Sequence, residues 1–396
     1  MTNPRDRVIL EARRSPLGSF MGSLAPLAAP EILAPVLRAL TESSPGIATE
    51  VDEAVVGCVL SAGLGQAPAR QAVLLAGLPE HTGATTINKV CGSGMKSLML
   101  ADALLASGQA KIVMAGGMES MSRAPYLLAQ ARSGQRMGHG TLIDHLLYDG
   151  LENAADHKVM GAFAELCADR YGFDRPRQDA FAIRSVERAR LAQATGAFDD
   201  EIVPLTVPAR KAPVEVTIDE GPGRVDLERI GSLKPAFRPD GTVTAASSSS
   251  ISDGAAALLL TTAGEADRRG LRPLARLVAS ASHAQAPEWF TTAPVGAIRK
   301  LLERTGWPLA SVDLFEINEA FAVVTLAAIQ DLGLSPERVN VHGGACALGH
   351  PIGASGARLV VTLTHALIRR GGRRGIAALC IGGGEATAVA IERLDA

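Results

Sequence analysis

The sequence predicts an α/β fold built from two similar halves, with an inserted loop domain in the first half. Three observations lead to this prediction. Apolar runs of strand length alternate with longer runs of helical spacing along the 396 residues, an alternation that buries a sheet beneath helices. One order of motifs occurs twice. A loop-rich segment separates the two occurrences, and a hydrophobic content of 47% is enough to form a core around both.

Strands are predicted where an apolar run is bounded by turn residues. The first is "VILEA" (8–12), which follows the charged start of the chain. Six further runs have the same character: 51–60, 111–117, 255–262, 274–282, 312–318 and 375–384. The segments 94–108 and 355–371 space their apolar residues as helices do and end in glycine, a residue that commonly terminates helices.

The repeated pattern places two chemically active side chains at equivalent positions. Val51 opens a strand, and Cys91 precedes a helix 40 residues later; Val312 opens a strand, and His350 precedes a helix 38 residues later. Each helix is followed by a strand that ends near a Gly-Gly pair. If the halves pack about a pseudo-twofold axis, Cys91 and His350 face each other where α/β sheets usually bind ligands.

Residues 119–248 differ from the two halves because they are rich in loops, such as "RSGQRMGHG" and "ASSSS". They also contain the segment 177–196, whose apolar residues recur at helical spacing, a feature that a solvated linker lacks. We therefore expect an inserted loop domain of about residues 119–248, lying over the site. It belongs to an N-terminal half of residues 4–267, and the C-terminal half covers 271–394.

Composition argues against several classes of function. The formal net charge of −2 provides no basic field for nucleic acid. No apolar run is long enough to cross a membrane and no signal peptide is recognised, so we expect a cytoplasmic protein. The cysteines are odd in number and form no C-x-x-C pair, which argues against disulfides and a zinc site. They are Cys58, Cys91, Cys167, Cys346 and Cys380.

Glycine-rich strand–helix turns also suggest a nicotinamide-dependent oxidoreductase. Such an enzyme needs G-x-G-x-x-G directly after its first strand and an acidic residue about 20 positions later. The stretch "LEARRSPLGSF" supplies neither. The stretch "GSGMKS" likewise lacks the spacing of a phosphate-binding P-loop.

Cys91 lies in "NKVCGSGMKS", just before a predicted helix. Free N–H groups and the positive end of the helix dipole predict a thiolate there, and we expect the glycines to leave room for a substrate carbonyl. A buried structural cysteine is nevertheless the commoner case. His350, in "GHPIGASGAR" at the equivalent junction, shifts the interpretation toward a nucleophile with its base.

Two further stretches carry polar groups at strand ends. In "LCIGGGEAT", Cys380 ends an apolar strand, and the backbone N–H of Gly382 is placed to act as an oxyanion donor. A core cysteine is the alternative for Cys380. In "EINEAFA", Asn318 and Glu319 follow an apolar strand and need partners, although Asn318 could instead cap a helix.

Together these stretches resemble the thiolase family of acetyl-CoA acetyltransferases and 3-ketoacyl-CoA thiolases. Six segments match its motifs in order: "RSPLGSFMGSL", "NKVCGSGMKS", "AGGMESMSRAPYLL", "NEAFA", "GHPIGASGAR" and "CIGGGEAT". The resemblance covers nearly the whole chain. It implies the duplicated thiolase fold, with two βαβαβαββ halves in α/β/α/β/α layers, and an acyltransferase of fatty-acid metabolism.

The resemblance also implies a role for each catalytic candidate. Cys91 is the nucleophile that accepts the acyl group, and His350 activates it. His350 and a water held by Asn318 form one oxyanion site, and the backbone N–H groups of Cys91 and Gly382 form a second. Cys380 is the acid and base at the substrate α-carbon or at the CoA thiol. No metal or redox cofactor is implied, and CoA is a substrate.

Contacts to the acyl-CoA are implied for a second group of residues: Ser249, Met160, Phe237, Ala320, Phe321 and, through a gapped match, Arg224. Three positions depart from the pattern of short-chain members. Val159 replaces a histidine, Ala246 replaces a glycine, and Phe290 stands where several members have methionine. These changes leave the acyl chain length open.

We therefore expect an acetyl-CoA C-acetyltransferase, which joins two acetyl-CoA molecules into acetoacetyl-CoA and CoA and cleaves 3-ketoacyl-CoA in reverse. The alternatives are a 3-ketoacyl-CoA thiolase of broad chain length in β-oxidation, a ketoacyl synthase, and a non-catalytic acyl-CoA-binding protein of the same fold. A ketoacyl synthase has a second His or Asn where this chain has Cys380. The family resemblance further implies a homodimer or homotetramer.

Overall fold

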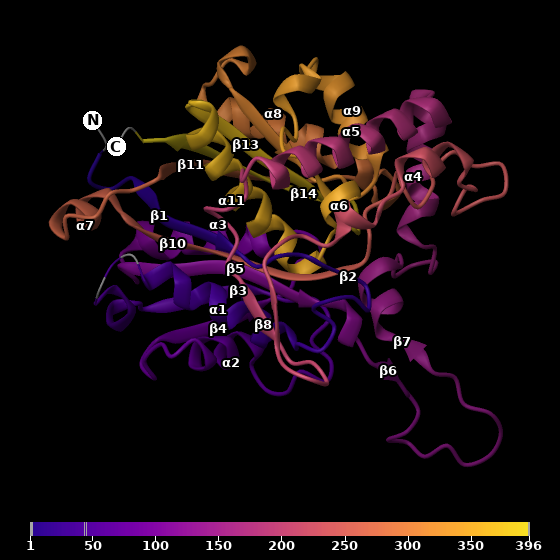
Figure 1. The fold of residues 1–396 in the computed structure, drawn as a ribbon, viewed down its shortest axis with the longest axis horizontal. Helices are drawn as coiled ribbons and strands as arrows, with labels where there is room; N and C mark the ends of the chain where they lie inside the picture. The colour runs from indigo at the N-terminus through magenta and orange to yellow at the C-terminus, as the bar shows by residue number, and fades with distance from the viewer. Residues whose placement is uncertain (1–2, 43, 45, 395–396) are drawn as a thin grey trace.

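The computed structural model describes residues 3–42, 44 and 46–394. Its main feature is a mixed sheet of ten strands whose central path runs β12-β13-β14-β11-β1-β10-β5-β3-β4, with the short β2 paired to β10. Figure 1 shows the N-terminal half, in indigo and purple, on one side of this sheet path and the C-terminal half, in orange and yellow, on the other. The two chain ends lie close together on one side of the molecule.

The first half follows the order β-α-β-α-β-α-β-β. Its elements are β1 (Arg7–Arg14), α1 (Ala29–Glu42), β3 (Glu53–Gly57), α2 (Pro68–Leu75), β4 (Gly83–Ile87), α3 (Ser93–Ser107), β5 (Ile112–Ser120) and β10 (Ser252–Thr262). In space, these strands are arranged β4-β3-β5-β10-β1. β3 runs parallel to both β4 and β5, so the helices between them cross over the sheet.

The second half repeats the order. Its elements are β11 (Ala275–Ala284), α8 (Ala293–Thr305), β12 (Leu314–Ile317), α9 (Ala322–Leu332), α10 (Ala345–Leu348), α11 (Ile352–Arg370), β13 (Arg374–Ile381) and β14 (Glu385–Arg393). The position of β4 is taken by a single parallel bridge between Phe315 and Val339. With that bridge included, the spatial order of strands is the same in both halves, so the predicted duplication is present in the topology.

The two halves meet where β1 pairs antiparallel with β11 over Arg7–Ile9. The buried clusters separate the layers around this joint. One cluster places α1 and α2 on the outer face of the first half, and another places α8 and α9 on the outer face of the second. Between the halves, apolar residues of α3 and α11 share one core with both groups of strands. The five-layered thiolase arrangement predicted for the chain is confirmed.

The connection between β5 and β10 contains the loop region. Its elements are β6 (Tyr126–Leu127), β7 (Ile143–Asp144), a π-helical turn (Leu147–Leu151), α4 (Met160–Tyr171), α5 (Arg175–Ala194), β8 (Leu205–Val207), β9 (Val214–Val216) and α6 (Gly221–Arg224). Between β6 and β7 the chain projects away from the body (Figure 1). The predicted helix at 177–196 is α5, which starts earlier because Asp174 caps it.

The remaining short elements are β2 (Gly18–Ser19) and α7 (Ala263–Arg268). Several predicted strands are shorter in the structure: 51–60 contains β3 at Glu53–Gly57, and 312–318 contains β12 at Leu314–Ile317. The domain boundaries at 4–267 and 271–394 stay a prediction. Among the described residues, no helix is both long and apolar enough to cross a membrane.

Candidate active site

Cys91 and His350 occupy equivalent positions in the two halves. α3 begins at Ser93 and α11 at Ile352, so each of the two side chains stands two residues before its helix. The two helices pack against each other in the layer between the halves. The duplication thus brings the thiol and the imidazole to one place, as the repeat predicted.

Glycines set how closely the two helices approach. A Cβ atom at Gly94 would lie 2.8 Å from the backbone nitrogen of Ala357, and a Cβ at Gly356 would overlap the backbone nitrogen of Met95. A Cβ at Gly92 would overlap the side chain of Ile381. The expectation that Gly92 and Gly94 leave room for substrate is therefore wrong. They are needed because protein atoms, rather than a substrate carbonyl, fill that space.

The turn that carries Cys91 is strained. Val90 has φ of 48°, in the left-handed region that a β-branched residue rarely adopts. Two side chains hold it there. Asn88 Oδ1 accepts the N–H of Val90, and Ser93 Oγ accepts the N–H of Lys89 while donating to the Val90 carbonyl. Strain of this kind persists only where surrounding bonds fix the backbone, which is common at functional sites.

The Cys91 sulfur accepts hydrogen bonds from the backbone N–H groups of Gly382 and of Cys91 itself. Burial nevertheless raises the pKa of the thiol to about 11, because removing the thiolate from water outweighs these two bonds. The expectation of a resting thiolate is therefore wrong. Two N–H groups converging on one point still provide a place for negative charge to develop during a reaction.

Gly382 is aimed into the site by a tight hairpin. β13 and β14 pair through Ile381 and Glu385, so only three glycines connect them. Gly383 and Gly384 have φ of 91° and 88°, a conformation that residues with a Cβ rarely adopt. The run of glycines after Cys380 is thus required by the turn that presents the Gly382 N–H.

His350 is held through both ring nitrogens. Nδ1 lies 2.5 Å from Ser355 Oγ, and Nε2 lies 3.4 Å from Nδ2 of Asn318. The backbone N–H of His350 donates to the carbonyl of Ser250. Burial, together with the positive charge of Arg358, lowers the pKa of the imidazole to about 3. The ring is therefore neutral at physiological pH.

Asn318 does not cap a helix, because α9 begins at Ala322 with Phe321 at its N-cap. Its side chain is fully buried, and its Oδ1 has no hydrogen-bond partner among the described residues. Cys380, on β13, is also buried, and burial raises the pKa of its thiol, as would a negative charge on Cys91. The sequence pattern thus located two buried groups, one of which has a polar atom that no described residue satisfies.

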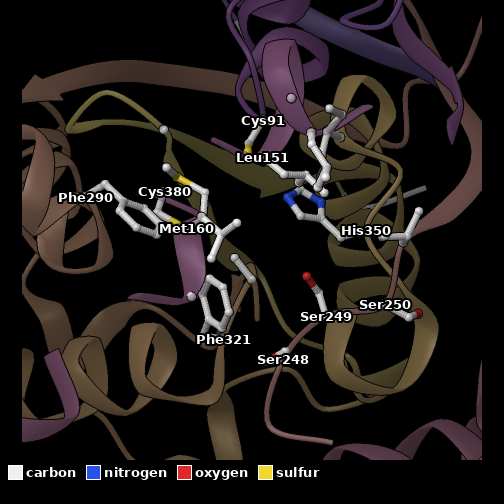
Figure 2. A pocket seen from close by; sticks show the side chains of 18 of the residues that line it. Cys91, Leu151, Met160, Ser248, Ser249, Ser250, Phe290, Phe321, His350 and Cys380 are labelled. Carbon is white, nitrogen blue, oxygen red and sulfur yellow. The ribbon is translucent and has the colours of Figure 1, made fainter. Parts of the chain in front are cut away.

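One apolar cavity of about 290 Å³ joins these groups. Figure 2 shows Cys91, Cys380 and the His350 ring directed into it from different elements, with Phe290, Phe321 and Met160 along one side and the serine segment 248–250 along another. Nine of the predicted site residues line the cavity: Cys91, His350, Cys380, Gly382, Ser249, Met160, Phe237, Ala320 and Phe321. Asn318 is not among the lining residues, but its Nδ2 lies 3.4 Å from Nε2 of His350, which is.

Sequence reasoning missed part of this wall. The π-helical turn contributes Leu147, Gly150 and Leu151, and Ile352 closes the cavity near His350. π-Helical turns are often found at functional sites, but nothing in the residue pattern indicates one here. The serine segment is fixed by backbone pairing, since Ser249 N–H donates to the Ala320 carbonyl.

Arg224 lies outside this cavity. It lines a neighbouring cavity of about 390 Å³ that shares Ser248, Ser250 and Ile251 with the first, and it pairs with Glu220 at 3.0 Å. Ala246 lines the same neighbouring cavity. The two cavities adjoin along the serine segment, so an extended ligand could occupy both.

Comparison with known proteins agrees with this geometry. The family model described as "Thiolase, N-terminal domain" matches residues 7–264, and "Thiolase, C-terminal domain" matches residues 271–393. The chain belongs to the thiolase family. As a thiolase, it is an acyltransferase enzyme.

Relatives cover nearly the full length of this thiolase. An acetyl-CoA acetyltransferase of Pseudomonas aeruginosa is 49% identical over 98% of the chain and 100% of that protein. The crystal structure of the Bacillus anthracis acetyl-CoA acetyltransferase superposes with a TM-score of 0.96 at 42% identity, over 98% of this chain and 99% of the other. The structure of the Acat5 thiolase of Ascaris suum in complex with coenzyme A superposes with a TM-score of 0.93 at 42% identity, over 98% of this chain and 100% of the other.

The other cysteines of the thiolase are buried in its core. Cys58 contacts Glu119, Cys167 lies in the cluster beneath α4, and Cys346 contacts the backbone of Glu319. Among the described residues, no group of three or more His, Cys, Asp or Glu side chains is arranged to hold a metal ion.

Proposed function

We propose that this thiolase is an acetyl-CoA C-acetyltransferase, which condenses two acetyl-CoA molecules to acetoacetyl-CoA and CoA and catalyses the reverse thiolysis. One observation carries the proposal: a thiol, an imidazole and a second thiol line a single apolar cavity together with the Gly382 backbone. The names of the relatives, which are 46 to 49% identical, support the same activity.

In the first step, His350 Nε2 takes the proton of Cys91, and the sulfur attacks the carbonyl carbon of the acyl thioester. The bond between that carbon and the CoA sulfur breaks, and the CoA thiolate takes the proton from His350. The developing oxyanion is stabilised by His350 and by a water on Asn318, whose Oδ1 is free to hold one. Coupling attack to proton transfer suits a nucleophile that rests as a thiol.

In the second step, Cys380 first gives its proton to solvent, and the thiolate then removes an α-proton from acetyl-CoA. The resulting carbanion attacks the acyl carbon on Cys91, and the oxyanion formed on that carbon is stabilised by the N–H groups of Cys91 and Gly382. When the oxyanion collapses, the C–S bond of the acyl-enzyme breaks, and the departing Cys91 thiolate takes the proton now held by Cys380. The two N–H groups already converge on one point beside the Cys91 sulfur. Both steps need only protons and thioesters, so we propose that no metal or redox cofactor takes part.

The two adjoining cavities support a proposal for where CoA binds. We propose that the pantetheine arm passes Ser249 and that the nucleotide end lies in the neighbouring cavity, on the side of Arg224. The acyl end then faces Met160, Phe237 and Phe321. Because Phe237 and Phe290 both pack edge-on against Phe321, the aromatic wall is rigid and favours a short acyl group.

We further propose a cytoplasmic homodimer or homotetramer. Large apolar side chains are exposed on α2 and on the projecting segment between β6 and β7, a pattern that marks protein contacts. They include Leu74, Leu75, Tyr126, Met137 and Leu142. Light scattering on the purified protein measures the assembly, and a monomer at micromolar concentration would contradict it.

The proposal is tested by intact mass after incubation with acetyl-CoA. The wild-type protein is expected to gain one acetyl group. Cys91→Ala is expected to gain none and to lose turnover by at least about 10⁴-fold. Cys380→Ala is expected to keep the adduct but form no acetoacetyl-CoA. Cys167→Ala, a buried thiol outside the cavity, serves as the control; an adduct that persists in Cys91→Ala would refute the assignment.

Chain length is tested separately with acetoacetyl-CoA and 3-ketodecanoyl-CoA in the thiolysis direction. The aromatic wall predicts a kcat/KM at least about 100-fold higher for the shorter substrate, roughly the discrimination that a filled apolar pocket achieves. Comparable rates would instead support the broad-range 3-ketoacyl-CoA thiolase. No adduct and no turnover with either substrate would support the non-catalytic alternative.

A further inference from the structure

The hydroxyl of Ser355 determines which nitrogen of His350 carries the proton. Ser355 is fully buried in the first turn of α11, and its Oγ lies 2.5 Å from His350 Nδ1 and 2.9 Å from the Pro351 carbonyl oxygen. The hydroxyl has one hydrogen, and a carbonyl oxygen can only accept. Both contacts are hydrogen bonds only when Nδ1 carries a hydrogen: the hydroxyl then donates to the Pro351 carbonyl, which also accepts the N–H groups of Ala354 and Ser355, and accepts from Nδ1.

The other side of the ring agrees with this assignment. Nε2 faces Nδ2 of Asn318 at 3.4 Å, and an amide nitrogen can only donate. A hydrogen on Nε2 would set two donors against each other. Asn318 could relieve this only by turning its Oδ1, now without a partner, toward the ring. Ser355 and Asn318 thus favour the same tautomer from opposite sides.

We infer that Ser355 is a positioning residue that keeps the proton on Nδ1 and leaves Nε2 as the base for Cys91. This inference rests on the proposed function, because it assigns the base of the acylation step. When Nε2 takes the thiol proton, the imidazolium keeps Ser355 as the acceptor for Nδ1–H, and the new Nε2–H donates to the thioester oxygen rather than facing Asn318 Nδ2. The proton then passes from Nε2 to the departing CoA sulfur, and the original tautomer is restored.

A neutral acceptor has a second consequence for the resting site. A carboxylate beside Nδ1 would stabilise an imidazolium and, with it, a permanent thiolate on Cys91. Ser355 gives the ring a fixed orientation without that charge. The pair therefore stays as thiol and imidazole until a thioester arrives, which agrees with the low pKa of His350 and the high pKa of Cys91.

The tautomer is measured by ¹⁵N NMR on histidine-labelled protein, with the His350 signals assigned from their absence in His350→Asn. The wild type is expected to show a hydrogen on Nδ1 and none on Nε2. In Ser355→Ala the hydrogen is expected to move to Nε2, with a fall of about 10- to 100-fold in the rate of Cys91 acetylation, the effect of leaving one buried donor unpaired.

Ser97→Ala is the matched control. Ser97 is fully buried in α3, and its hydroxyl donates to the Gly94 carbonyl at 2.7 Å, but it contacts none of the proposed catalytic side chains. It is expected to change neither the tautomer nor the acetylation rate by more than about twofold. Ser355→Ala behaving like Ser97→Ala, or a wild-type signal with the hydrogen on Nε2, would overturn the inference.

Ser355→Asp tests the neutral acceptor and does not depend on turnover. A carboxylate there is expected to charge the ring and to speed alkylation of Cys91 by iodoacetamide at pH 7 about tenfold or more. Unchanged alkylation in a folded variant would contradict the inference. Because the NMR result needs no substrate, failure of the proposed activity with the expected tautomer would remove the function and leave the assignment of Ser355 in place.

Discussion

The last connection of each half differs more than any other part of the duplicated fold. In the second half, β13 and β14 are joined by Gly382–Gly384 alone, and the turn presents a backbone N–H. In the first half, the equivalent strands β5 and β10 are separated by residues 121–251, which build most of the cavity wall. The same place in the fold thus supplies the proposed oxyanion donor in one half and most of the cavity wall in the other.

The two strand–helix junctions differ in a second way. The first places a thiol after the strained Val90, and the second places an imidazole before Pro351. Neither residue type is demanded by the fold, because each side chain stands two residues before its helix and both helices pack through glycine. Duplication therefore fixes where chemistry can occur, and the identity of one residue in each half decides what that chemistry is.

The largest expected effect comes from disrupting the close contact between α3 and α11, the helices that follow Cys91 and His350. Gly356→Ala places a methyl group against the backbone nitrogen of Met95, which cannot move without shifting α3. We expect a loss of about 3 kcal/mol or more in the free energy of unfolding, the upper range for overpacking. Urea unfolding measures this, and turnover should fall together with it because Cys91 moves.

Gly231→Ala is the control for that variant. A Cβ at Gly231 meets nothing within 4 Å, so its stability should change by less than about 1 kcal/mol. If Gly356→Ala were as stable and active as Gly231→Ala, the two helices would not need their close approach.

A smaller effect tests whether the Cys91 thiol and the His350 imidazole are charged in the resting protein. Burial raises the pKa of Cys91 from an ordinary 9.0 to about 11, so at pH 7 its thiolate fraction is about 100-fold lower than that of a free thiol. Alkylation of Cys91, followed by peptide mass, should be slow at neutral pH and rise about tenfold per pH unit up to pH 11.

His350→Ala sharpens that measurement. Since the buried imidazole is neutral at pH 7, its removal should leave the alkylation rate within about threefold of the wild type. If the alkylation rate of the wild type reached a plateau near pH 6, and His350→Ala lost that plateau, Cys91 and His350 would instead form an ion pair at rest.

The smallest effect concerns the ion pair between Lys89 and Glu385. It joins the turn before Cys91 to the start of β14, directly after the three glycines. Both side chains are partly exposed, so Lys89→Gln should cost no more than about 1 kcal/mol in unfolding free energy. Turnover should fall by about two- to fivefold, because the Gly382 N–H is held less firmly against Cys91.

Arg268→Gln removes a surface ion pair with Glu265 far from the cavity and should leave turnover unchanged. A fall of more than about 100-fold in Lys89→Gln would give the ammonium a direct part in the reaction, which the present arrangement does not include.

Sequence patterns predicted the features that repeat or alternate. The strand–helix order, the helices that became α3 and α11, and the equivalence of Cys91 and His350 all follow from spacing that the chain displays twice, and α5 follows from the helical spacing of its own apolar residues. The convergence of Cys91, His350 and Cys380 on one cavity could be inferred because strand ends of one sheet meet at the same edge.

Features that depend on packing between distant segments could not be predicted. The protonation of Cys91 depends on burial by residues from both halves, so helix position alone gave the wrong sign for its pKa. The glycines beside Cys91 make room for segments more than 250 residues away, Gly92 for Ile381 of β13 and Gly94 for α11. The contribution of Leu147 and Leu151 depends on a π-helical turn that leaves no periodic signal, and Arg224 lies in a cavity whose walls the local sequence does not define.

The glycine contact between α3 and α11 has a consequence for how the specificity of this thiolase could be redesigned. Because backbone meets backbone there, the spacing of the two helix N-termini that follow Cys91 and His350 depends on no side-chain rotamer at the contact. The two helices therefore form one rigid component of constant spacing. Room for a different acyl group must therefore come from the cavity wall that residues 121–251 form between β5 and β10. Within this connection, residues 147–161 are the natural target for library design.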